Sequence, residues 1–310
     1  MSQPLPQLYS STDTSIVHAL RYDWNGWFDS TATDLSTVEQ RLPDVITACR
    51  PLWLADGLET NTWRLTPDGT LQVLFTVAPH LSPALCAARA KGRLDHALRQ
   101  SHHRAYPGVD DAIGLVPVEG RLIPADAPQA LAPPAPHLRF AFRRNVALRT
   151  LGENTREIVD AYLTRQAVKS DYADPRFKTF LDQFNTTQPT VDLAQPAATG
   201  HGRYWCNLHL VITVADRRYP MINEGSFAVI RDAAFAIAAA NGHQLAHIAV
   251  MPDHLHLSLR FAHETAPADV GLHYLNGLAA ALHRNQRCWN SEFYVGSFSE
   301  YDLDTIRRRG

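Results

Sequence analysis

The hydrophobic pattern of residues 203–310 predicts strands and helices in a regular order. "YWCNLHLVITV" (204–214) predicts one strand, and "QLAHIAVMPDHLHLSLRF" (244–261) predicts two strands joined around Pro252-Asp253. Apolar residues at helical spacing predict helices over 226–242 and 266–286. The chain then ends in a predicted strand, a turn and the start of a helix. This β-α-β-β-α-β order is typical of a ferredoxin-like unit with an antiparallel sheet.

The same order of elements recurs in the first half of the chain. Two strands around Thr66-Pro67-Asp68, a helix, and a final strand, turn and helix are expected over 60–77, 82–100 and 146–166. We therefore predict an α+β protein made of two tandem ferredoxin-like domains that arose by internal duplication.

The predicted boundaries follow from two proline-containing stretches. Residues 123–137, rich in proline and alanine, are expected to be an insert of the first domain. The polar residues 171–202 are expected to be a linker, which leaves a first domain over 1–170 and a second over 203–310.

Composition narrows the class of protein. Of 310 residues, 45% are hydrophobic and 19% are charged, which indicates a globular chain. The formal net charge of −2 argues against a broad basic surface for duplex DNA but leaves room for a local arginine patch. The polar start predicts no signal peptide, and the apolar runs are shorter than the ~18 residues of a membrane span. The four cysteines are scattered, so we expect a reduced, cytoplasmic protein without membrane contacts.

"MPDHLHLSL" (251–259) contains a candidate metal site. In a strand, His254 and His256 point to one face, and Leu255 and Leu257 point to the other. Two imidazoles on one face can hold a metal, although such a pair can equally be two solvated histidines.

Three segments together resemble a known family. "VMPDHLHLSL", "YWCNLHLVITVADRRYPMI" and "FYVGSFSEYDLDTIRR" resemble the single-tyrosine HUH transposases of bacterial insertion sequences and the related REP-associated tyrosine transposases. The resemblance is strong over 203–310 and weaker over 15–170. It implies an enzyme that nicks and joins single-stranded DNA with hairpin ends through a 5′-phosphotyrosine intermediate.

The resemblance also implies a cofactor and ligands. The two histidines would bind a divalent metal, Mg²⁺ or Mn²⁺, with a glutamine four residues after the nucleophilic tyrosine. A phenol with a pKa near 10 is a weak nucleophile at neutral pH, and a metal that polarises the scissile phosphate lowers that barrier.

Each predicted domain departs from the family pattern in a different way. In the second domain, Arg309 stands where the tyrosine is expected. In the first domain, Thr70 and Gln72 stand where the histidines are expected, yet the last helix, "TREIVDAYLTRQ", contains Tyr162 and, four residues later, Gln166. In many relatives two subunits exchange their tyrosine helices. We therefore predict a monomer acting as a fused pseudo-dimer, with one composite site of Tyr162, His254, His256 and Gln166.

Alternatives remain at several positions. Tyr162 can also be a packing residue of an amphipathic helix. Tyr274, Tyr294 and Tyr301 are rival nucleophiles, and we interpret Tyr294 and Tyr301 as structural because they fall in the predicted strand and at the entry of the last helix. Basic residues that could contact DNA, or simply form a solvated surface, are Lys91, Arg93, Arg99, Arg217 and Arg218.

Two classes of function follow from these observations. The first is metal-dependent single-stranded DNA nicking and strand transfer, as in DNA transposition. The alternative is a catalytically inactive, domesticated transposase-like protein that binds DNA hairpins, and a structural nucleoid protein is a more remote option. Retention of one complete site would favour the enzyme.

Overall fold

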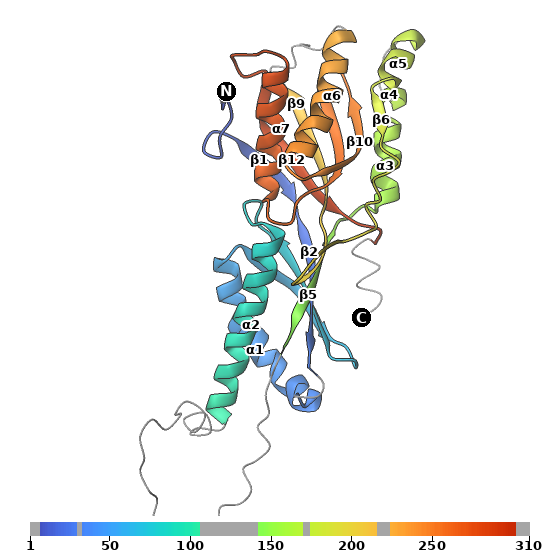
Figure 1. Ribbon diagram of the computed structural model, residues 1–310. Helices are drawn as coiled ribbons and strands as arrows, with labels where there is room; N and C mark the ends of the chain where they lie inside the picture. The colour runs from blue at the N-terminus through green and yellow to red at the C-terminus, as the bar shows by residue number, and fades with distance from the viewer. Residues whose placement is uncertain (1–6, 30–32, 106–141, 170–173, 216–223, 302–310) are drawn as a thin grey trace, which may run out of the picture.

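The computed structural model describes residues 7–29, 33–105, 142–169, 174–215 and 224–301. Two sheets, each of six strands within these residues, lie end to end in an elongated molecule (Figure 1). In these residues no helix is long and apolar enough to cross a membrane.

The first sheet has the strand order β3-β4-β2-β5-β8-β7. Its strands are β2 (Arg21–Phe28), β3 (Leu58–Leu65), β4 (Thr70–Val77), β5 (Phe142–Leu151), β7 (Ala197–Thr199) and β8 (Gly202–Trp205). One face is covered by α1 (Leu35–Ala55) and α2 (Pro83–Ala105) (Figure 1). The strands β2, β3, β4 and β5 pair antiparallel in the order typical of a ferredoxin-like unit.

The second sheet repeats this arrangement in the order β1-β12-β9-β11-β10-β6. Its strands are β1 (Ser15–Ala19), β6 (Asn185–Thr187), β9 (Asn207–Val214), β10 (Gln244–Val250), β11 (His254–Arg260) and β12 (Trp289–Phe298). The covering helices are α6 (Glu224–Ala240) and α7 (Pro267–Ala281). The fold is therefore α+β with two ferredoxin-like units, which confirms the predicted fold class.

Each unit lends a strand to the sheet of the other. β1 pairs in parallel with β12 of the second sheet, and after Leu20 the chain enters the first sheet as β2. In the same way β8 pairs in parallel with β5 of the first sheet, and after Cys206 the chain enters the second sheet as β9. The predicted strand 204–214 is therefore divided, because its two parts belong to different sheets.

The ends of β5 and β12 cross closely between the sheets. The Thr150 hydroxyl donates to the Phe298 carbonyl at 2.9 Å, and the Ser297 hydroxyl donates to the Leu151 carbonyl. A Cβ atom on Gly152 would lie 2.1 Å from the Ser297 carbonyl oxygen, so the crossing requires glycine there. Beyond this point each chain segment continues toward the sheet of the other unit.

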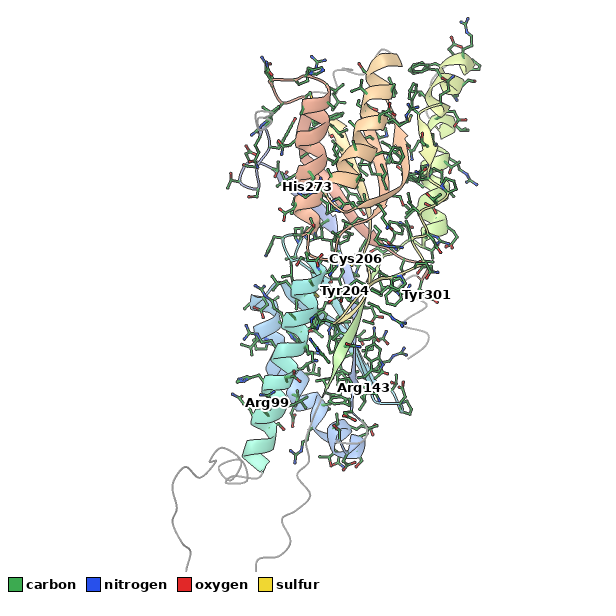
Figure 2. All side chains as sticks on the ribbon, viewed as in Figure 1. Arg99, Arg143, Tyr204, Cys206, His273 and Tyr301 are labelled. Carbon is green, nitrogen blue, oxygen red and sulfur yellow. The ribbon has the colours of Figure 1, made fainter. Side chains whose placement is uncertain are left out.

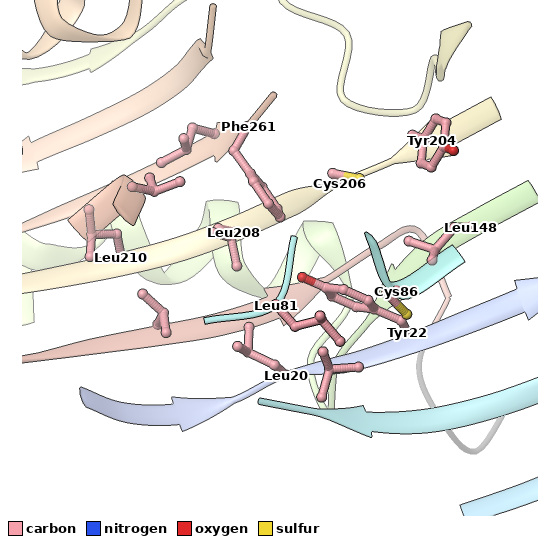
Figure 3. Packing of buried hydrophobic residues seen from close by; sticks show 14 of the residues in the cluster. Leu20, Tyr22, Leu81, Cys86, Leu148, Tyr204, Cys206, Leu208, Leu210 and Phe261 are labelled. Atoms are coloured by element: carbon pink, nitrogen blue, oxygen red, sulfur yellow. The ribbon is translucent and has the colours of Figure 1, made fainter. Parts of the chain in front are cut away.

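The hydrophobic core runs through both units without a break. Leu20 and Tyr22 of the first unit lie against the strand that carries Cys206 and Leu208 of the second (Figure 3). All four side chains are at most 1% exposed. Burial of this shared apolar surface fixes the two sheets relative to each other.

The segment 171–202, expected as a linker, contains regular structure. It includes α5 (Pro175–Asp182), β6 at the edge of the second sheet and β7 at the edge of the first. These short strands pair with exposed sheet edges, a tertiary effect that the polar composition of the segment does not reveal. The expected insert 123–137 lies outside the described residues.

Candidate functional site

The last helix of the first unit packs on the second sheet. After the crossing, α3 (Arg156–Thr164) lies against β10 and β11, on the face opposite α6 and α7 (Figure 1). Val159 and Leu163, four residues apart, are buried in one cluster with Ala246 of β10 and Phe298 of β12. The Arg156 amide donates to the Ser299 carbonyl at 2.7 Å, which anchors the start of the helix. This amphipathic packing determines where Tyr162 lies.

The end of α3 is held by side-chain amides. Asn185 Nδ2 donates to the carbonyls of Leu163 and Thr164 at 3.0 and 3.2 Å. Gln166, which begins α4 (Gln166–Lys169), is 7% exposed, and its Nε2 donates to the Tyr162 carbonyl at 3.1 Å. The helix breaks at Arg165, so Gln166 does not continue the α3 face in a regular way.

The two histidines of β11 lie on the face that α3 covers. Leu255 and Leu257, on the other face, are fully buried in the main core. His254 Nδ1 lies 2.7 Å from Asp253 Oδ1, and because a carboxylate only accepts, the imidazole donates. The ring centroids of His254 and His256 are 4.9 Å apart and nearly perpendicular.

Tyr162 comes to this histidine pair from the other unit. Its ring is perpendicular to that of His256, with centroids 5.2 Å apart. Tyr162 is 39% exposed, so the residue is not buried in the core. The structure thus brings Tyr162 and the His254–His256 pair together across about 90 residues of sequence.

A third histidine, His209 of β9, belongs to the same cluster, and sequence reasoning missed it. Its Nε2 lies 3.0 Å from Nδ1 of His256, and its ring centroid is 6.1 Å from that of Tyr162. Alternation along 204–214 already places His209, Val211 and Thr213 on one face. What the sequence does not give is the strand register that sets His209 beside His256.

The imidazoles at the centre of the cluster are held in the neutral form. Burial lowers the pKa of His256 to about 2, with smaller contributions from His209 and His254. Burial also lowers the pKa of His209 to about 4. At neutral pH both rings therefore have an unprotonated nitrogen, the form that binds metals.

Two imidazole nitrogens at this cluster carry no proton that is used in a hydrogen bond, which is what a metal ligand requires. Among the described residues, His256 Nε2 is buried and has no hydrogen-bond partner, and the side chain is only 4% exposed. In a neutral His254 ring, Nδ1 donating to Asp253 leaves the Nε2 atom without a proton. No group of three His, Cys, Asp or Glu residues in the described part of the chain is arranged to hold an ion. The imidazoles of His254 and His256 are therefore the candidate ligands that the geometry brings together here.

The rival tyrosines differ in their surroundings. Tyr274 of α7 is fully buried in the core. Tyr301 stacks with Arg149 on the first sheet, 5.3 Å from ring centroid to guanidinium carbon. Tyr294 of β12 is closer to the cluster, since its ring centroid is 5.9 Å from that of His209. Tyr294 is therefore the appropriate matched control for Tyr162.

The equivalent face of the first sheet is chemically different. Gln72, which the sequence places at a lost histidine position, donates through Nε2 to Asp23 Oδ2 at 2.8 Å, and Arg64 Nε donates to its Oε1 at 2.5 Å. Burial raises the pKa of Asp23 to about 6, although the hydrogen bonds from Gln72 and Asn25 act in the opposite direction and lower it. No imidazole from β2 or β4 lies on this face.

The basic residues predicted to contact DNA are only partly free to do so. Lys91 Nζ donates to the Arg143 carbonyl at 2.7 Å, and Arg93 forms an ion pair with Asp56 at 2.9 Å. Arg99 is exposed on α2, on the helical side of the first sheet and far from α3 (Figure 2). Arg217, Arg218 and Arg309 lie outside the described residues.

The fold and this geometry place Tyr162 beside a cluster of three histidines on a ferredoxin-like sheet. Residues 203–308, which contain the strands β9, β10, β11 and β12, match the family model described as "Transposase IS200 like". A search of curated proteins found no match.

Two solved structures are similar to part of the chain. A candidate transposase from Deinococcus radiodurans R1 is 24% identical, and the match covers 33% of this chain and 86% of that one, with a TM-score of 0.26. A REP-associated tyrosine transposase bound to a REP hairpin is 11% identical, and the match covers 34% of this chain and 61% of that one, with a TM-score of 0.28.

Proposed function

We propose that this protein nicks single-stranded DNA with hairpin ends and transfers the strand through a 5′-phosphotyrosine intermediate, using one composite active site. The observation that carries the proposal is the position of Tyr162, perpendicular to His256 with ring centroids 5.2 Å apart. The match of residues 203–308 to the IS200-like transposase model supports the same class of chemistry.

In the proposed site, His254, His256 and Gln166 would hold a divalent metal, Mg²⁺ or Mn²⁺. When bound, such an ion polarises the scissile phosphate and neutralises charge that develops on its oxygens. The protein's contribution is to hold both histidines with bare Nε2 atoms and to fix the backbone of α3 beside them.

Tyr162 is the proposed nucleophile. Its hydroxyl oxygen attacks the phosphorus, a bond from Tyr162 to the 5′ phosphate forms, and the bond to the 3′ oxygen breaks. The phenol gives up its proton to water, which reaches this 39% exposed residue, and the departing 3′ oxygen takes up a proton. Attack of a 3′ hydroxyl on the phosphotyrosine reverses these changes and joins a strand.

The complementary losses in the two units support a fused pseudo-dimer. The first unit supplies the tyrosine helix, the second supplies the histidines, and β1 and β8 are exchanged in matching positions. We therefore propose a monomer in solution. Light scattering should give a mass near 34.5 kDa, and twice that mass would contradict the proposal.

A cleavage assay tests the proposed activity. Hairpin oligonucleotides are incubated with Mn²⁺ and the wild-type protein, Tyr162→Phe, His256→Ala or the matched control Tyr294→Phe. We expect cleavage by the wild-type and Tyr294→Phe proteins only. Hairpin binding with no cleavage by any of the four would favour the non-cutting alternative, a DNA-hairpin-binding protein.

A further inference from the structure

His209 forms a hydrogen bond with the proposed metal ligand His256. The His209 Nε2 atom lies 3.0 Å from His256 Nδ1, and the two rings are inclined by only 20°. Between two neutral imidazoles one nitrogen must donate its proton and the other must accept it. The direction of this bond therefore determines which nitrogen of His256 is bare.

The surroundings of His256 favour one direction. Its Nε2 is buried without a partner among the described residues, so a proton there would be an unsatisfied buried donor. With the proton on Nδ1, His256 donates to His209 and keeps an Nε2 lone pair. His254 has the same arrangement, because its Nδ1 faces the Asp253 carboxylate.

We propose that His209 is a positioning residue, which accepts the Nδ1 proton of His256 and so holds its Nε2 bare and aimed at the metal. This inference rests on the proposed function, since it assigns His209 a role in the same site. Metal-bound imidazoles usually donate their other N–H to a supporting acceptor, which fixes both tautomer and ring orientation.

Two aromatic rings fix His209 itself. Tyr162 and Tyr294 meet its ring edge to face, with centroids 6.1 and 5.9 Å away. Strand pairing sets His209 opposite Ser258, diagonally next to His256 on the same face. The acceptor is therefore held in position by neighbours on three elements, α3, β11 and β12.

The first sheet has a related contact at the same register positions. Asp23 pairs opposite Leu74, diagonally next to Gln72, as His209 is to His256. There Asp23 accepts a hydrogen bond from Gln72 at 2.8 Å. The proposed bond from His256 of β11 to His209 of β9 thus corresponds to the bond from Gln72 of β4 to Asp23 of β2.

The first test needs no variant, no metal and no DNA. Nitrogen-15 NMR of the metal-free wild-type protein, labelled at histidine, reports the tautomer of each ring. We expect His256 in the form protonated on Nδ1. A His256 ring protonated on Nε2 would overturn the proposal, whatever the protein does to DNA.

The second test measures binding of Mn²⁺ alone by calorimetry. His209→Ala removes the acceptor and should weaken binding roughly 10- to 100-fold, whereas His209→Gln restores an acceptor oxygen and should stay within a few-fold of the wild type. His273→Ala, the matched control, removes an imidazole of α7 on the opposite side of the sheet and should leave Mn²⁺ affinity unchanged (Figure 2).

The outcomes separate this role from the proposed activity. Equal Mn²⁺ affinity of His209→Ala and the wild type would overturn the positioning role, as would a His209→Gln variant that binds as weakly as His209→Ala. Thermal unfolding of each variant shows whether the fold is retained. If Mn²⁺ binding depends on His209 while no hairpin is cleaved, the positioning role stands and the proposed nicking activity fails.

Discussion

Replacing Asp23 by asparagine should remove a large pH-dependent contribution to the free energy of unfolding of the protein. Asp23 lies on β2, on the face of the first sheet that corresponds to the histidine face of the second. It is 6% exposed, and its Oδ1 atom is buried without a hydrogen-bond partner among the described residues. Gln72 and Asn25 donate to Oδ2, at 2.8 and 3.1 Å.

The magnitude follows from the pKa. Burial raises the pKa of Asp23 from 3.8 to about 6, and the hydrogen bonds and the charges of Arg149 and Arg64 offset only part of this. The folded protein binds this proton more tightly than the unfolded chain. The contribution of this bound proton to the free energy of unfolding is therefore complete below pH 3.8 and is lost as the pH rises through 6. A pKa shift of this size corresponds to about 3 kcal/mol of unfolding free energy, all of which is lost by pH 8. About 1 kcal/mol of it is already lost at pH 4.5.

Urea unfolding, followed by tryptophan fluorescence, measures the effect. The free energy of unfolding of Asp23→Asn, relative to the wild type, should rise by about 2 kcal/mol between pH 4.5 and pH 8. Asp44→Asn, which removes an exposed carboxyl of α1, is the control and should follow the wild type. A constant difference between Asp23→Asn and the wild type at all pH values would refute the reasoning.

Three further predictions concern the crossing and the docking of α3. Gly152→Ala should lower the free energy of unfolding by about 3 kcal/mol or more in urea titrations, because its Cβ would meet the Ser297 carbonyl at 2.1 Å; a near-neutral effect would show that the crossing is wrong. Leu163→Ala, at a fully buried position, should cost about 2–5 kcal/mol and speed hydrogen exchange in α3, and unchanged exchange would contradict the packing on β10. Asn185→Ala removes the amide that binds the last carbonyls of α3 and should cost about 1–2 kcal/mol by thermal unfolding; no loss would mean that water replaces the cap.

Periodicity alone predicted the elements around the histidines closely. The strands expected over 244–261 are β10 and β11, which are separated at Pro252-Asp253, and the helices expected over 226–242 and 266–286 are α6 and α7. These predictions succeed because alternation, helical spacing and proline act locally. The repeated order of elements also predicted the ferredoxin-like unit in each half.

Features that depend on pairing between distant segments were not predictable in this way. The exchange of β8 divides a continuous apolar run at Cys206, and nothing in the composition of that run marks the change of sheet. His209 was missed for the same reason, since its importance comes from its register against His256. The expectation that Tyr162 pairs with the second unit came from comparing the two halves: the first lacks the histidines and the second lacks the tyrosine. That comparison uses the whole chain and not a local pattern.

The composite site is tested most directly by identifying the residue that becomes joined to DNA. A hairpin oligonucleotide is incubated with Mn²⁺ and the wild-type protein, the protein is digested, and the peptide that carries a nucleotide is sequenced by mass spectrometry. The account predicts a 5′-phosphate ester on Tyr162 and none on the neighbouring Tyr294. An adduct on Tyr294 or Tyr301 would contradict the composite site, and cleavage without any tyrosine adduct would contradict the phosphotyrosine mechanism.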